Sequence, residues 1–161
     1  MDLKEFYLKQ KQAVHQGSLS VYGKIPPDRL DWRPVDSVLT LGQVVRHAWM
    51  SEQGIRRIAL DNDWTYFEKR IPQGLPAVLG EVKSLADELQ EIARVHTDTL
   101  RAVEAFPRER WHEIRENAQF EIKRSVSVWL YGINEHQIHH RAQVGVYLRI
   151  LTGERASSYA L

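Results

Sequence analysis

The sequence of 161 residues contains no cysteine. This absence excludes disulfide bonds, thiolate metal ligands and a cysteine nucleophile, so any metal site must use nitrogen and oxygen ligands. The sequence also has no apolar run close to the roughly 20 residues that are needed to span a bilayer. We therefore expect no membrane partner. Residues 1–12 are charged and lack an apolar core, so we expect no signal peptide and a cytoplasmic location.

A concentrated basic surface is absent as well. The 22 Lys and Arg residues are interspersed with 21 Asp and Glu residues, for a net charge of +1. Because phosphate binding relies on clustered basic groups, we expect a small-molecule substrate and not nucleic acid as the main partner. The content of 43% hydrophobic and 27% charged residues is typical of a globular protein, and the length predicts one domain over residues 1–161.

Capping signals and helical periodicity predict four helices, over residues 2 to 17 or 23, about 40–60, 76–106, and 125 or 127 to 153. The connection over residues 61–75 is rich in aromatic residues and should pack down on the helices. Residues 111–124 alternate weakly and predict a short β-hairpin. We therefore expect an all-α fold, a four-helix bundle with a long crossover between the second and third helices. The tail after Gly153 should pack or fray.

The last predicted helix carries three of the seven histidines within five residues, His136, His139 and His140. Residues four apart lie one turn apart on the same face, so His136 and His140 could reach one ion, but His136 and His139 are also neighbours. On a helical wheel His136 and His140 share a sector with apolar residues, namely Trp129, Ile133, Val144 and Tyr147. We favour this pair as ligands and keep His139 as a supporting or surface residue, with hydrogen-bonded core histidines as the alternative.

A third ligand must come from another helix, and His47 is the best candidate. It lies two turns into the second predicted helix, on the side that carries Val44, Ile55 and Ile58. His15 and His96 have charged or polar neighbours and are interpreted as surface residues, and His112 has no assigned role. Gln43 and Tyr147 could line the same pocket, or could serve as a capping residue and a core aromatic.

Three segments together resemble the DinB/YfiT-like superfamily: LDWRP (residues 30–34), RHAWMSE (residues 46–52) and NEHQIHHRAQ (residues 134–143). The resemblance runs from the first predicted helix to Leu151. It implies that His47, His136 and His140 are the metal ligands and leaves His139 outside them. The family often has glycine where this chain has Ala142, which is also small.

The resemblance also implies a function. Family members are four-helix bundles, often homodimers, that bind a divalent ion such as zinc or nickel. Some are S-transferases that use bacillithiol or mycothiol, and others are labelled metal-dependent hydrolases or damage-inducible proteins. Because the chain has no cysteine, sulfur chemistry would need a low-molecular-weight thiol as cosubstrate.

The predicted function is therefore a metal-dependent transferase that activates such a thiol for attack on an electrophile. The alternatives are a hydrolase that uses metal-bound hydroxide and a non-catalytic metal-binding stress-response protein. Neither Glu52 nor Glu135 is well placed in the sequence as a general base, which favours transfer slightly. Arg141 points away from His136 on the wheel and should lie at the surface. No side chain is assigned a catalytic role.

Overall fold

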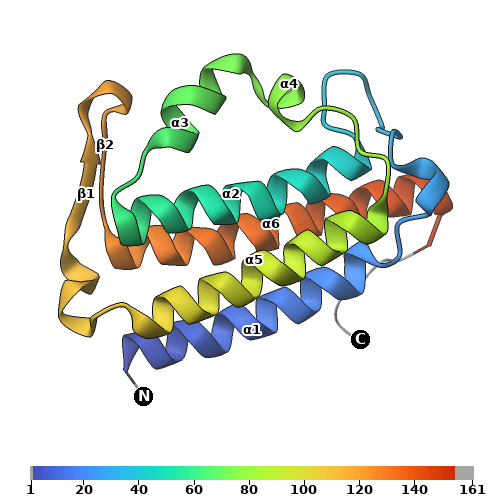
Figure 1. Cartoon of the computed structure of the whole chain (residues 1–161). Coiled ribbons are helices and arrows are strands. Elements are labelled where there is room, and N and C mark those ends of the chain that lie inside the picture. The colour runs from blue at the N-terminus through green and yellow to red at the C-terminus, as the bar shows by residue number, and fades with distance from the viewer. Residues whose placement is uncertain (1, 155–161) are drawn as a thin grey trace.

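The computed structural model describes residues 2–154, which are mostly helical with one small sheet. Four long helices pack along one another (Figure 1): α1 (Leu3–Tyr22), α2 (Leu41–Asp61), α5 (Leu85–Ala105) and α6 (Val126–Thr152). Helices α1 and α2 each contact both α5 and α6. The all-α expectation is confirmed. Residue 1 and residues 155–161, which include most of the expected tail, lie outside the description.

The helix starts follow the capping signals in the sequence. Thr40 and Gln43 form a reciprocal capping box at the start of α2, and the Ser125 side chain accepts a hydrogen bond from the Val128 amide at the start of α6. Gly153 has a φ of +76°, a left-handed conformation that ends α6 at the predicted position. These caps fix where α2 begins and where α6 begins and ends.

The crossover between α2 and α5 is longer than expected. It contains α3 (Thr65–Arg70), a 3₁₀ turn (Ile71–Gln73) and α4 (Leu75–Leu79). The prediction of one helix from residue 76 to 106 is wrong, because Gly80 has a φ of +61° that stops α4, and Ser84 caps a new start at α5. Val82 is buried against Gly42, where an added Cβ would lie 2.7 Å from the Val82 Cβ. Val82 is thus apolar and buried at a spacing that fits a helix, although the residues around it are not helical.

The predicted hairpin is confirmed. Strands β1 (Ile114–Asn117) and β2 (Ile122–Ser125) pair antiparallel, with Ile114 opposite Ser125. A 3₁₀ turn (Ala118–Phe120) joins them, and two others (Pro27–Arg29 and Arg108–His112) lie in the connections after α1 and α5. The Arg115 Nε donates a 2.9 Å hydrogen bond to the Ala59 carbonyl, which ties the hairpin to the end of α2.

Candidate metal centre

Three histidines from two adjacent helices converge in the interior. His47 comes from α2, and His136 and His140 lie one turn apart on α6. One ring nitrogen from each can be chosen so that all three lie within 4.8 Å of one another. The Nε2 atoms of His136 and His140 are 3.1 Å apart. Two nitrogens bound tetrahedrally at roughly 2.1 Å from zinc would be about 3.4 Å apart, so this arrangement could hold a metal ion.

The three imidazoles are held in their neutral form. Burial lowers the pKa of His136 to about 3, and the neighbouring His140 and His47 lower it further. Burial likewise lowers the pKa of His47 to about 4 and lowers the pKa of His140. At pH 7 each ring therefore has a nitrogen lone pair, which is the form that binds metal.

Hydrogen bonds orient two of the rings. The His140 Nδ1 lies 2.9 Å from the Gln143 Oε1, and the Gln143 Nε2 donates to the Tyr147 hydroxyl at 3.0 Å. Because an amide oxygen only accepts, the His140 Nδ1 carries the proton and its Nε2 keeps the lone pair. The His47 Nδ1 lies 3.1 Å from the Ser51 Oγ. Sequence reasoning missed Gln143 and Ser51, although their spacings of three and four residues from a histidine could have suggested both.

The His136 ring has an unusual environment. Its Nδ1 is buried and has no hydrogen-bond partner among the described residues. Its Nε2 faces the lone pair of His140 across 3.1 Å. A proton on the His136 Nε2 would bridge this gap, and a shared cation would take the place of that proton. Two ring nitrogens this close, with a third nearby, fit a divalent ion.

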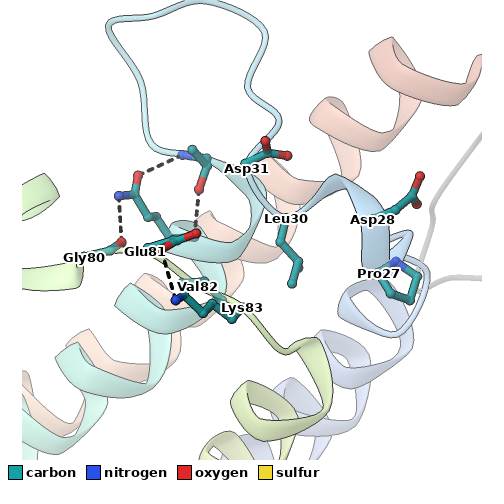
Figure 2. A pocket seen from close by; sticks show the side chains of 10 residues that line it. Pro27, Asp28, Leu30, Asp31, Gly80, Glu81, Val82 and Lys83 are labelled. Carbon is teal, nitrogen blue, oxygen red and sulfur yellow. Dashed lines mark hydrogen bonds and ion pairs between the residues drawn. The ribbon is translucent and has the colours of Figure 1, made fainter.

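Gln43 lies apart from the three rings, and His139 is next to them but outside the converging set. Gln43 caps α2, and its Nε2 donates to the Gly80 carbonyl at 3.1 Å. It lines a hollow of about 530 Å³ beside Asp31 and Val82, and none of the three converging histidines lines this hollow (Figure 2). His139 is exposed, with its ring 4.9 Å from that of His140, and lines a separate hollow of about 430 Å³ together with His136.

Comparison with known proteins assigns the chain to a family. The profile of the DinB superfamily matches residues 12–144, which include all three converging histidines. The chain belongs to the DinB superfamily. A crystal structure of a DinB-like protein from Bacillus subtilis is similar, with a TM-score of 0.73 over 95% of each chain at 16% sequence identity. No curated protein matched. Within residues 2–154 of this DinB superfamily member, no helix has both the length and the apolar content needed to cross a bilayer.

A second polar cluster corrects the prediction that His15 and His96 lie at the surface. Both are 7% exposed, and their rings stack at a centroid distance of 3.7 Å. The Lys11 ammonium donates to the His96 Nδ1 at 3.2 Å and pairs with the Glu52 carboxylate at 2.9 Å. Lys11, one turn before His15 on α1, is itself buried between the helices, whereas Arg94 near His96 is exposed. Arg141 was also expected at the surface and is only 9% exposed, whereas His112 is exposed.

This stacked pair predicts a loss of stability in mild acid. Burial and the Lys11 charge lower the pKa of His15 to about 4 and that of His96 to about 3. Between these values and the unfolded value of 6.5, the unfolded chain binds more protons than the folded one. The free energy of unfolding should therefore be highest above pH 6.5 and fall by roughly 1 kcal/mol per histidine for each pH unit below it.

Urea unfolding between pH 7 and pH 5 measures this slope, and His15→Phe tests its origin. Phenylalanine keeps an aromatic ring against His96 but cannot bind a proton. We expect a shallower pH dependence in this variant than in the wild type, with both samples in the same metal state. Equal slopes would show that the pair does not cause the acid sensitivity.

Proposed function

We propose that this DinB superfamily member is a metal-dependent thiol S-transferase built on a four-helix bundle, in which His47, His136 and His140 hold one zinc or nickel ion. The observation that carries the proposal is the convergence of three neutral imidazoles, those of His47 and His140 buried and that of His136 half-buried. Zinc and nickel both accept nitrogen ligands of this kind. The family membership supports the same interpretation.

A divalent ion bound by three neutral ligands would keep its full positive charge and would favour the thiolate form of a low-molecular-weight thiol. Ser51 and Gln143 would hold the His47 and His140 rings in place by their hydrogen bonds. In the transfer, a bond forms from the thiol sulfur to a carbon of the electrophile as the bond from that carbon to its halide leaving group breaks. The thiol proton passes to solvent.

The surroundings of the two nearest acidic residues favour transfer over hydrolysis. A hydrolase would benefit from a carboxylate free to act as a general base. The Glu52 Oε2 is already held by the Lys11 ammonium and by the Gln137 Nε2, at 2.9 and 3.0 Å. Glu135 is exposed and lines the hollow beside His136. Sulfur from a cosubstrate needs no such base, because the cation itself stabilises the thiolate.

Elemental analysis followed by a thiol assay tests the proposal. We expect about one divalent ion per chain and conjugation of a low-molecular-weight thiol to 1-chloro-2,4-dinitrobenzene and to iodoacetamide. Chelation should abolish conjugation, and added zinc or nickel should restore it. Ester hydrolysis without any thiol would favour a hydrolase instead. A bound ion that only raises the melting temperature, with no turnover, would favour a non-catalytic metal-binding protein. Protein that binds no ion on titration would overturn the site itself.

We also propose that the protein forms homodimers, as the family resemblance implies. Helix α6 exposes several apolar side chains on the described part of the chain, namely Val128, Ile138, Val146 and Ile150. Light scattering on the purified protein measures the assembly. The cytoplasmic location stays a prediction.

A further inference from the structure

A hollow of about 430 Å³ lies directly beside His136. Its apolar walls come from separate elements: Ile55 of α2, Phe67 of α3, Ile122 of β2 and Trp129 of α6. We call it the His136 pocket. Its volume is within the range of roughly 300–1,000 Å³ that holds small organic ligands. Because His136 belongs both to this lining and to the histidine cluster, a ligand in the pocket would lie against one of the three rings that would hold the proposed ion.

Gly132 leaves space in this pocket. It lies one turn before His136 on α6 and lines the same hollow. A Cβ built at Gly132 would meet nothing within 4 Å. A glycine in a helix interior costs about 1 kcal/mol relative to alanine, so packing does not explain the residue. The missing side chain instead keeps open the space in front of Trp129 and His136.

The aromatic walls of the His136 pocket favour a ligand with a flat ring. Phe67 and Trp129 meet edge to face, with centroids 6.2 Å apart and an interplanar angle of 79°. The Trp129 Nε1 is buried and has no hydrogen-bond acceptor among the described residues. Because this atom is enclosed, the aromatic faces and not the indole N–H carry the preference for a ring. Arg124, stacked over Trp129 at 5.3 Å, and Glu135 add one charge of each sign to the lining, so net charge favours neither a cation nor an anion.

We propose that the His136 pocket is the subsite for the electrophile, and that it takes a neutral, ring-bearing electrophile such as a halonitroarene. The proposal rests on the proposed transferase function. The new sulfur–carbon bond forms at the ring carbon that loses its halide. Small electrophiles without a ring react at the same centre but do not use the pocket walls.

The Gly132→Leu variant tests the subsite, with Gly132→Ala as its matched control. A helical side chain leans toward the N-terminus of its helix, so leucine at 132 would fill the pocket near Trp129 and leave the three histidines in place. We expect unchanged metal content in Gly132→Leu, and a loss of iodoacetamide turnover much smaller than the loss for 1-chloro-2,4-dinitrobenzene. The KM for 1-chloro-2,4-dinitrobenzene should rise ~10-fold or more, since blocking an apolar contact removes substrate binding. Gly132→Ala should retain most of the wild-type affinity.

A binding experiment separates this proposal from the proposed function. The unreactive probe 1,3-dinitrobenzene should bind the metal-loaded wild type, measured by quenching of tryptophan fluorescence, and bind Gly132→Leu at least ~10-fold more weakly. This result without any thiol turnover would support the pocket and overturn the transferase. Turnover with the same KM in both proteins would overturn the pocket alone. If Gly132→Leu loses its metal, Phe67→Ala carries the test, because it removes one wall and lies outside the histidine cluster. Unchanged probe affinity in Phe67→Ala would then overturn the pocket.

Discussion

The His140→Ala variant should lose its divalent ion and, with it, thiol conjugation. His140 supplies one of the three converging nitrogens, and its Nε2 lies 3.1 Å from that of His136. Removing a residue that only orients a ligand costs about 10–100-fold in metal affinity, so loss of a ligand itself should exceed ~100-fold. Isothermal titration with zinc, on protein shown to be folded by circular dichroism, measures the affinity.

Two further variants should lower the metal affinity less than His140→Ala does. His139→Ala removes the adjacent histidine, which is exposed, and should leave the affinity almost unchanged. Gln143→Leu removes the acceptor that holds the His140 Nδ1–H and should lower the affinity by roughly 10–100-fold. An His140→Ala protein with wild-type affinity, or equal losses in the variants of His139 and His140, would contradict the proposed ligand set.

The Lys11→Met variant should lose about 3–5 kcal/mol in the free energy of unfolding. The Lys11 and Glu52 side chains are 0% and 3% exposed and pair at 2.9 Å. Methionine fills a similar volume but leaves the Glu52 carboxylate buried without its cation. Desolvation of that charge is then no longer offset by the ion pair, although Gln137 still donates to it at 3.0 Å. Chemical denaturation at pH 7 measures the loss.

The same helix offers a matched control. Lys9 pairs with Glu5 at 3.1 Å, but their side chains are 66% and 50% exposed. Lys9→Met should therefore change the free energy of unfolding by no more than about 1 kcal/mol. The double variant Lys11→Met with Glu52→Leu should recover much of the stability, because no unpaired charge remains in the interior. A loss in Lys11→Met as small as that in Lys9→Met would show that the buried pair does not stabilise the fold.

Local sequence signals predicted the starts of α1, α2 and α6 and the inward direction of the three histidines, but not the start of α5. Thr40 and Ser125 cap their helices because each provides a side-chain oxygen three residues before an unpaired amide. The wheel also placed His47 and the pair His136 and His140 toward the interior, because apolar residues share their faces. These features depend on contacts within one helix, which sequence periodicity records directly.

The features that sequence reasoning missed depend on contacts between helices. Lys11 and His15 mark a polar face of α1, and polarity predicts exposure unless partners are known. Those partners are Glu52 on α2 and His96 on α5, and only the packed structure brings them together. Val82 led to the opposite error, a helix predicted where there is none. It is buried against Gly42 in an irregular segment, and its position in the sequence matches the apolar spacing of the helix that follows. Neither pairing can be inferred from spacing along one chain segment.

Because the histidines come from both α2 and α6, the proposed ion would link two distant parts of the chain. His47 and His136 are separated by the second half of α2, the whole crossover, α5 and the hairpin. An ion that joins them would close one long loop of the chain, in the manner of a cross-link, and would restrict the unfolded chain if it stayed bound there. It would also bind the folded state far more tightly, because only folding brings the three rings together. Chelation would thus loosen the contact of α2 with α6 before that of α1 with α5, and hydrogen exchange would first increase along the α2–α6 seam.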